Sequence, residues 1–268
     1  MSENARRAAE VDGCAAVGTE TALEAGRLLM GRFRTEITVS HKTSAINLVT
    51  EMDLEAEKLI VAKLLAAFPG HAILAEEKYA DAARGPRTWI IDPLDGTTNY
   101  AHGYPVWAVS IALELEGEIE WGVVHNPNLG ETFSARRGRG ARLGRKRLRV
   151  SRVPALDSSL LATGFPYDIR TSQRNNLDYF REFALLAQAV RRAGSAALDL
   201  AYVAAGRFDG FWELELGPWD CAAGVLLVRE AGGRVTNLQG EPGSIYQREV
   251  VATNGLIHDE MLAVLRGR

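Results

Sequence analysis

Apolar residues at helical spacing predict two helices near the start of the chain. The first pattern covers residues 11–33, is rich in alanine, and ends in large apolar side chains that repeat on one face. The second begins after Thr50, which is typical of an N-cap because Asp53 follows three residues later. It ends at Pro69-Gly70. We therefore expect two amphipathic helices joined by a loop.

Short apolar runs after the second helix predict strands. The first run stops on Glu76-Glu77 and the next on Asp92, so two strands deliver carboxylates at their ends. Two later runs flank Glu116-Gly117-Glu118, which is typical of a hairpin turn. The first half is therefore expected to be β-rich, with strands at 72–75, 88–91, 106–115 and 119–124 and further strands and turns over 131–150.

The second half of the chain alternates strand and helix patterns, which is typical of an α/β fold built in layers. No internal repeat or long linker interrupts it, so we expect one domain over residues 1–268 whose halves, about 1–150 and about 151–268, pack intimately. The expected strands lie near 159–163, 189–192, 208–214, 233–236 and 249–253, and the expected helices near 173–188, 195–205, 218–230 and from 257 onward.

Composition narrows the class of protein. The 268 residues are 47% apolar and 24% charged, which excludes disordered, collagen-like and coiled-coil chains. No apolar run reaches about 18 residues and the N-terminus lacks a signal-peptide core, so we expect a cytoplasmic protein with no membrane partner. Cys14 and Cys221 lie far apart without metal-ligand spacing, which argues against disulfides and zinc. A net charge of −3 indicates no particular partner.

The eight residues directly after the second predicted strand read DPLDGTTN. A proline turn holds Asp92 and Asp95 in one geometry, which suits the oxygen-seeking, octahedral Mg²⁺ ion, and the Leu94 carbonyl could add a ligand. Gly96 lets a ligand approach the main chain, and the amides of Gly96 and Thr97 at a helix start could cradle a phosphate. The segment thus indicates a phosphate held by metal.

The same segment has a plain alternative, because Asp, Pro and Gly are also the commonest formers of surface turns. A calcium EF-hand is excluded, since its third and twelfth positions would be Leu94 and Gly103. Walker A, dinucleotide-binding, nucleophile-elbow and HExxH patterns are missing. A plain turn and a metal-held phosphate both stay open on this segment alone.

Two further acidic positions favour the metal site. Glu76 ends the strand before that of Asp92, and Asp220 lies in the first turn of the helix that begins at Pro218, where the helix dipole favours a carboxylate. Each also has a structural interpretation, a solvated strand end for Glu76 and a helix cap for Asp220. Their occurrence together with the DPLDGTTN turn indicates a shared site.

These blocks together resemble the signature sequences of the inositol monophosphatase family. The resemblance spans about residues 40–260 and rests on LAEE at 74–77, WIIDPLDGTTN at 89–99, PWDCAAG at 218–224, NLVT at 47–50 with Asp53, and RAGSAALDL at 192–200. It implies a layered α-β-α-β-α fold, usually a homodimer, that hydrolyses phosphate monoesters with Mg²⁺ and is inhibited by Li⁺. Ala75 and Met52 depart from the family pattern, which commonly has glycine and threonine there, but neither departure removes a ligand.

The resemblance implies a site with two or three Mg²⁺ ions. Glu76, Asp92 and the Leu94 carbonyl would hold one ion, and Asp92 would bridge to a second ion held by Asp95 and Asp220. A third, weaker ion would rest on Glu76 through waters. The first two ions would lie about 3.5–4 Å apart, one activating a water and the other stabilising the leaving oxygen.

The resemblance also implies the catalytic groups. Thr97 would orient the attacking water with its hydroxyl tied to Asp53, and Glu76 would serve as the base. Asp53 has a structural interpretation as well, since Thr50 and Asp53 form a capping box, and one carboxylate can do both. Other residues would contact substrate, with Arg191 our choice for the arginine near its hydroxyls or phosphate and Glu213 alternatively an ordinary exposed strand residue. They are Leu94, Asp95, Gly96, Thr97, Arg191, Gly194, Ser195, Ala196, Glu213 and Asp220.

We therefore expect a Mg²⁺-dependent phosphomonoesterase that converts myo-inositol 1-phosphate, or a similar small polyol phosphate, into the alcohol and phosphate by in-line attack of an activated water. Alternatives within the same fold are histidinol phosphate, fructose 1,6-bisphosphate and 3′-phosphoadenosine 5′-phosphate. Gly217 and Pro218 replace the His-Cys of animal enzymes, which fits a bacterial enzyme and leaves the alcohol open. Nucleotide phosphatases usually carry longer insertions, which disfavours the last alternative.

A basic segment suggests a different, non-enzymatic activity. Nine Lys or Arg residues lie between 136 and 152 and could neutralise phosphates of a nucleic acid, although no stacking aromatic residue accompanies them. Binding of RNA or a transcription complex, known for some bacterial relatives, is therefore an alternative that a salt-dependent shift with RNA would reveal. The favoured interpretation is a solvated hairpin opposite the acidic residues Glu114, Glu116, Glu118 and Glu120.

Overall fold

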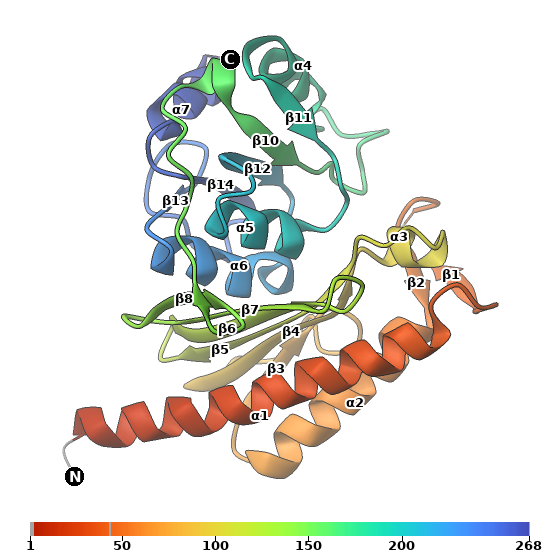
Figure 1. Cartoon of the computed structure of the whole chain (residues 1–268). Coiled ribbons are helices and arrows are strands. Elements are labelled where there is room, and N and C mark those ends of the chain that lie inside the picture. Colours follow the sequence, from red (N-terminus) through yellow and green to blue (C-terminus); the bar gives the residue numbers. More distant parts are fainter. Residues whose placement is uncertain (1–2, 43, 268) are drawn as a thin grey trace.

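The structure, a computed structural model, describes residues 3–42 and 44–267 (Figure 1). The two expected N-terminal helices, α1 (Glu3–Arg32) and α2 (Glu51–Ala67), pack side by side as the outermost layer. Among the described residues, no helix is both long enough and apolar enough to cross a membrane.

Helix α1 begins before the predicted start at residue 11. Residues 3–10 contain no large apolar side chain, so no helical periodicity can be seen there, although their alanine, arginine and glutamate residues favour a helix. Tertiary contacts complete this part of α1, because Arg7 forms ion pairs with Glu116 and Glu120 of the neighbouring sheet at 2.7 and 3.1 Å.

A seven-stranded sheet forms the second layer, in the order β3-β4-β5-β6-β7-β8-β9. Its first pair is parallel and the others are antiparallel, and α1 and α2 cover one face while the later helix α6 (Pro218–Glu230) packs on the other. Because both faces are covered, every residue of β5 is buried. The strands are β3 (Ala72–Ala75), β4 (Arg87–Asp95), β5 (Ala108–Leu115), β6 (Glu118–Asn126), β7 (Glu131–Arg136), β8 (Gly140–Leu143) and β9 (Lys146–Arg147).

The predicted hairpin is confirmed, with Glu116 and Gly117 at φ values of 54° and 84° between β5 and β6. The basic segment that follows differs in part from its favoured interpretation. Arg137 does pair with Glu118 of β6, but Arg136 pairs with Asp12 of α1. Glu114 is buried instead of opposing the segment, and it accepts a hydrogen bond from the Tyr246 hydroxyl at 2.9 Å.

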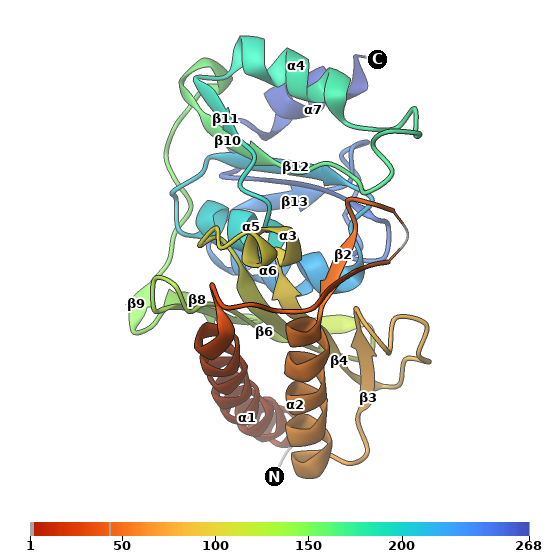
Figure 2. The ribbon, with the colours of Figure 1, turned by 90° about the vertical axis from the view of Figure 1, so that its right-hand side faces the viewer.

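A five-stranded sheet in the order β11-β10-β12-β14-β13 forms the fourth layer (Figure 2). Helices α5 (Ala196–Ala204) and α6 pack between the two sheets, and α4 (Leu177–Leu186) and α7 (His258–Arg266) cover the outer face. The layered α-β-α-β-α architecture is therefore confirmed. The strands are β10 (Leu160–Thr163), β11 (Ala189–Arg191), β12 (Gly210–Leu214), β13 (Arg234–Thr236) and β14 (Glu249–Thr253).

Helix α4 begins later than the predicted residue 173 because Asn176 breaks the pattern, and it ends at Leu186, where Ala187 is extended. Asn176 adopts a left-handed conformation with a φ of 68°, and its side chain donates to Thr163 Oγ1 at 2.8 Å and accepts from Trp212 Nε1 at 2.7 Å. This buried anchoring holds the preceding residues in a loop. The short elements not expected from apolar runs are β1 (Val39–His41), β2 (Leu48–Thr50), α3 (Thr97–Ala101) and the 3-10 turn η1 (Leu156–Ser158).

Candidate active site

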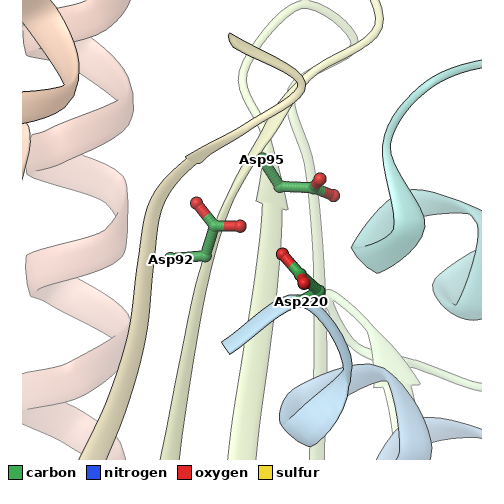
Figure 3. Close-up of side chains that lie close together, drawn as sticks. All are labelled: Asp92, Asp95 and Asp220. Carbon is green, nitrogen blue, oxygen red and sulfur yellow. The ribbon is translucent and has the colours of Figure 1, made fainter. Parts of the chain in front are cut away.

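Three aspartates from two distant parts of the sequence meet between the sheets. Carboxylate oxygens of Asp92, Asp95 and Asp220 lie within 4.8 Å of one another (Figure 3). The first two come from the end of β4, and Asp220 comes from the first turn of α6. Asp92 Oδ1 accepts the Leu94 amide at 3.0 Å, which fixes the turn that carries Asp95.

Each of the other two aspartates is held by a helix N-terminus. Asp95 Oδ2 accepts hydrogen bonds from Ser195 Oγ at 2.6 Å and from the Ala197 amide at 2.8 Å, which joins β4 to the start of α5. Asp220 Oδ2 accepts the Gly217 amide at 2.6 Å. The capping interpretation of Asp220 is therefore confirmed, and the cap is also what orients this carboxylate within the cluster.

Gly96 is a position where the site requires glycine. Its φ is 99°, and a Cβ there would approach the Val106 and Gly194 carbonyl oxygens to 2.9 and 3.2 Å. Asn99, one turn later, donates to the Val106 and Ala193 carbonyl oxygens at 2.7 and 2.8 Å. The loop after β4 and the loop before α5 are thus locked together, with no space for a side chain between them.

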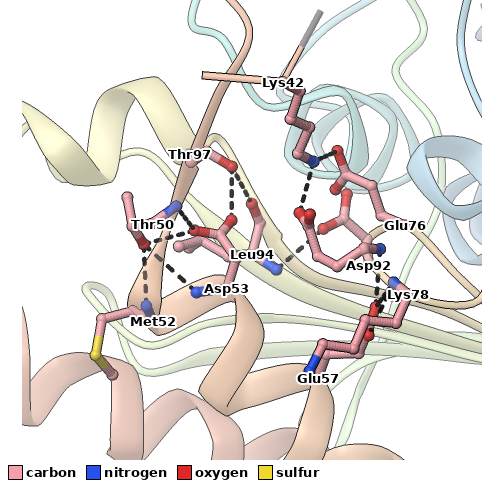
Figure 4. A network of polar contacts seen from close by, with 11 residues as sticks. Lys42, Thr50, Met52, Asp53, Glu57, Glu76, Lys78, Asp92, Leu94 and Thr97 are labelled. Atoms are coloured by element: carbon pink, nitrogen blue, oxygen red, sulfur yellow. Dashed lines mark hydrogen bonds and ion pairs between the residues drawn. The ribbon is translucent and has the colours of Figure 1, made fainter. Parts of the chain in front are cut away.

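Asp53 forms both of the contacts considered from the sequence (Figure 4). Its Oδ2 accepts the Thr50 amide at 2.8 Å and the Thr50 hydroxyl at 2.5 Å, so the capping box is confirmed. Its Oδ1 accepts the Thr97 hydroxyl at 2.8 Å, and the same hydroxyl oxygen lies 3.2 Å from the Leu94 carbonyl oxygen. Asp53 is fully buried on α2, so its hydrogen bond holds the Thr97 hydroxyl of α3 in a fixed orientation.

Glu76 directly follows β3, and parallel pairing with β4 brings it near Asp92, although it is not one of the three carboxylates whose oxygens lie within 4.8 Å of one another. Lys42, from the loop after β1, donates to Glu76 Oε1 at 2.8 Å and to Glu77 Oε1 at 2.6 Å. No role for Lys42 was predicted from the sequence, because only the fold brings the two segments together. Its ammonium group shows that a cation fits beside these carboxylates.

Burial and mutual repulsion raise the pKa values of the three aspartates. Burial, followed by the charges of Glu76 and Asp95, raises the pKa of Asp92 and of Asp220 well above the usual range. Burial also raises the pKa of Asp95 to about 6, although hydrogen bonds from Ser195 and Ala197 oppose it. A buried set of oxygen donors whose charges repel one another suits a hard divalent cation, so these residues fit Mg²⁺.

The raised pKa values predict that the metal-free protein loses stability as the pH rises. Burial raises the pKa of Asp53 and that of Asp95 to about 6, so the folded state binds protons that the unfolded state has released. The resulting stabilisation is fully present below about pH 4 and is lost as the pH rises through about 6. We expect the melting temperature in a chelator to fall by several degrees between about pH 5 and pH 7.5.

Thermal melts of wild type and Asp95→Asn at both pH values measure this effect. The variant lacks one of the titrating groups, so its melting temperature should fall less over the same interval. An equal or larger fall in the variant would contradict the assignment of the shift to these carboxylates.

A cavity of about 390 Å³ adjoins the aspartates. Apart from Leu94, which is buried, and Arg191, the residues predicted to contact substrate all line it. Arg191 ends β11 and is not among the residues that line the cavity, whereas its neighbour Arg192 lines it. Successive side chains of an extended chain point to opposite sides, and the sequence alone does not show which of the two arginines points toward the cavity. The lining members of the predicted set are Asp95, Gly96, Thr97, Gly194, Ser195, Ala196, Glu213 and Asp220.

The cavity lining includes two more carboxyl groups, those of Glu213 and Asp199. Glu213 is not an ordinary exposed residue, since its carboxyl group fills the space above Gly164, where a Cβ would meet it. Burial raises the pKa of Glu213 to about 8, against the opposing charge of Arg192. Asp199, which sequence reasoning missed, is 1% exposed, and its Oδ1 has no hydrogen-bond partner within the part of the chain that the structure describes. A lone aspartate inside an otherwise apolar helix was the available signal.

Comparisons with known proteins agree with this geometry. A model of the inositol monophosphatase family matches residues 10–267. The inositol-1-monophosphatase of Synechocystis is 44% identical over 93% of this chain and 87% of its own, and the Nus factor SuhB of Pseudomonas aeruginosa is 44% identical over 93% and 94%. The solved structure of inositol monophosphatase from Anabaena (Nostoc) superposes with a TM-score of 0.87 at 42% identity, covering 96% of this chain and 97% of that one.

The layered fold and the carboxylate site that it encloses are those of a phosphoric monoester hydrolase. The resemblance found in the sequence motifs is confirmed over nearly the whole chain. The chain belongs to the inositol monophosphatase family.

Proposed function

We propose that this phosphatase hydrolyses myo-inositol 1-phosphate to myo-inositol and phosphate, with Mg²⁺ as its cofactor. The observation that carries the proposal is the set of residues that line the cavity. The same cavity is lined by Asp95, Asp220 and Thr97, whose hydroxyl Asp53 orients, and by the carboxyl groups of Glu213 and Asp199, which suit a polyol. The names of the Synechocystis and Anabaena relatives support the same substrate.

Glu76, Asp92, the Leu94 carbonyl, Asp95 and Asp220 would hold the metal ions. Bound Mg²⁺ would lower the pKa of a water and neutralise charge that develops on the phosphoryl and leaving oxygens. The ammonium group of Lys42 occupies part of the same carboxylate array, so it competes with a metal ion for Glu76.

Thr97 would orient the attacking water. Because its hydroxyl donates its proton to Asp53, its oxygen is left with lone pairs that can accept a hydrogen bond from that water. Glu76 would take the second proton of the water as the base. Asp53 does not touch the reacting atoms in this scheme, and it acts by fixing the direction in which the Thr97 hydroxyl points.

Glu213 and Asp199 would recognise the alcohol. Protonated carboxyl groups both donate hydrogen bonds to and accept them from the hydroxyls of a polyol, and Glu213 and Asp199 supply no positive charge for a second phosphate, which disfavours fructose 1,6-bisphosphate and 3′-phosphoadenosine 5′-phosphate. When ionised, the same two groups would attract the ammonium group of histidinol phosphate. Histidinol phosphate is therefore the second candidate substrate, and Arg192 is the cavity residue that would resist it by charge.

Steady-state kinetics on all four phosphates, with Mg²⁺ present, tests the substrate. We expect the highest kcat/KM for myo-inositol 1-phosphate, and Glu213→Gln should raise its KM by about tenfold with little change in kcat, because a contact to the alcohol is made in both ground and transition states. Glu36→Gln, which removes a glutamate charge from an exposed position outside the cavity, is the matched control. A higher kcat/KM for histidinol phosphate than for myo-inositol 1-phosphate would make histidinol phosphate the substrate. No turnover of any of the four phosphates would refute the proposal.

Several finer features stay predictions. A homodimer, inhibition by Li⁺ and a cytoplasmic location follow from the family resemblance and the composition. Some relatives are named Nus factor SuhB, which keeps binding of RNA or a transcription complex through the segment 136–152 as a second role. The exposed side chains of Arg139, Arg142, Arg145, Lys146, Arg147, Arg149 and Arg152 are the cations available for it.

A further inference from the structure

A second buried carboxylate on α2 has no place in the scheme above. Glu57 lies one helical turn after Asp53 and is 1% exposed. Its carboxylate accepts the backbone amides of Glu77 and Lys78, with Oε2 at 2.8 Å and Oε1 at 3.1 Å (Figure 4). A buried, charged side chain that binds two main-chain amides fixes the backbone strongly, because those amides would otherwise lack partners.

The amides that Glu57 binds belong to the turn that carries Glu76. On the other side of Glu76, its own amide donates to the Ile91 carbonyl oxygen of β4 at 3.3 Å. The main chain around Glu76 is thus held from the sheet on one side and from α2 on the other. Lys42 holds the Glu76 side chain directly, but a metal ion bound to Glu76 would displace that contact. The hydrogen bonds from the Glu77 and Lys78 amides to Glu57 do not involve the Glu76 side chain, so they can persist when a metal ion replaces the Lys42 ammonium group.

We propose that Glu57 is a positioning residue that fixes the Glu76 turn so that the Glu76 carboxylate can bind a divalent cation. The proposal rests on the proposed function only in taking Glu76 as a ligand. Asp53 and Glu57 are four residues apart and therefore lie on the same face of α2. One holds Thr97 and the other holds the Glu76 turn, so a single helix sets the position of the water-orienting hydroxyl relative to the base.

Glu57→Gln tests the proposal while keeping the side-chain volume. Glutamine offers one carbonyl oxygen, and its amide nitrogen would face a backbone N–H that it cannot accept, so one of the two amides loses its partner. Calorimetric titration of the metal-free protein with MgCl₂ should show a Kd raised roughly 10- to 100-fold, the usual effect of losing a group that orients a metal ligand. The Mg²⁺ concentration for half-maximal activity should rise in parallel, while KM for substrate at saturating Mg²⁺ stays near the wild-type value.

Glu55→Gln is the matched control, since it removes the same charge from an exposed position on the same helix. We expect its Mg²⁺ affinity to stay within about twofold of wild type, because exposed charges are well screened. If Glu57→Gln fails to fold, Glu57→Asp takes its place. Aspartate keeps the charge but is one methylene too short to bridge the two amides, so it should show the same loss of Mg²⁺ affinity.

The two proposals fail in different ways. Wild-type affinity for Mg²⁺ in a folded Glu57→Gln protein, even with a lowered melting temperature, would overturn the positioning role and leave only a structural one. A loss in Glu55→Gln equal to that in Glu57→Gln would also overturn it, since net charge would then explain the effect. An inactive wild type that binds Mg²⁺ would refute the proposed reaction, and the calorimetric comparison would still decide the role of Glu57.

Discussion

Asp92→Asn is expected to lower phosphatase activity by about 10³-fold or more while the protein stays folded. Asp92 is the carboxylate proposed to bridge two ions, and losing its charge removes several kcal/mol of stabilisation from the transition state. Because asparagine keeps the side-chain shape and an oxygen that can still accept the Leu94 amide, the local turn should persist. Initial rates with saturating Mg²⁺ and substrate measure the loss.

The stability of the same variant separates a metal ligand from a structural aspartate. Asp92 is 1% exposed and is repelled by Glu76, Asp95 and Asp220, so neutralising it should leave the metal-free melting temperature unchanged or raise it. Added Mg²⁺ should then stabilise the variant less than it stabilises wild type. Asp157→Asn, an exposed change in the turn η1, should leave both activity and Mg²⁺ stabilisation intact. Retention of most activity in Asp92→Asn would refute its assignment as a ligand.

The cluster of Asp92, Asp95 and Asp220 was predictable from the sequence because its parts are local. A strand that runs into Asp92 and Asp95 through a proline turn, and a helix that begins at Pro218 just before Asp220, each fix a carboxylate within a few residues. Such short-range rules do not depend on the rest of the fold. What the sequence left open was whether these pieces meet, and the burial of α5 and α6 between the two sheets is what brings them together.

The residues that sequence reasoning missed or misplaced depend on contacts between distant segments. Lys42 reaches Glu76 only through the placement of the β1–β2 hairpin, and Glu57 reaches the Glu77 amide only because α2 packs beside β4. Arg191 was chosen from the sequence, whereas Arg192 lines the cavity, because the sequence does not show which side of the chain faces the cavity where β11 ends. A helical pattern also could not show that Asp199 faces a cavity, because burial against protein and burial beside a pocket give the same periodicity.

The roles of Thr97 and Asp53 can be separated by a double-mutant cycle. As a structural pair, Thr97 starts a helix of five residues and Asp53 caps α2, so Thr97→Ala and Asp53→Asn should each cost about 1 kcal/mol of stability and leave kcat near wild type. As a pair that orients the attacking water, either change should lower kcat by about 10²-fold or more with KM little altered, because the contact matters only as the nucleophile forms.

The double mutant then decides between independent and shared roles. The Thr97 hydroxyl donates to Asp53 Oδ1 at 2.8 Å, so once Thr97 is alanine there is no hydroxyl left for that oxygen to orient. The Thr50 cap on Oδ2 would still hold the start of α2 in Thr97→Ala, which keeps the helix as an internal control. We therefore expect the double mutant to be scarcely slower than the worse single mutant, as residues that act as a unit are not additive. Losses in kcat that multiply would show that Asp53 acts independently of Thr97. Its contact with Thr97 would then have no catalytic role, and the capping box would be its remaining function.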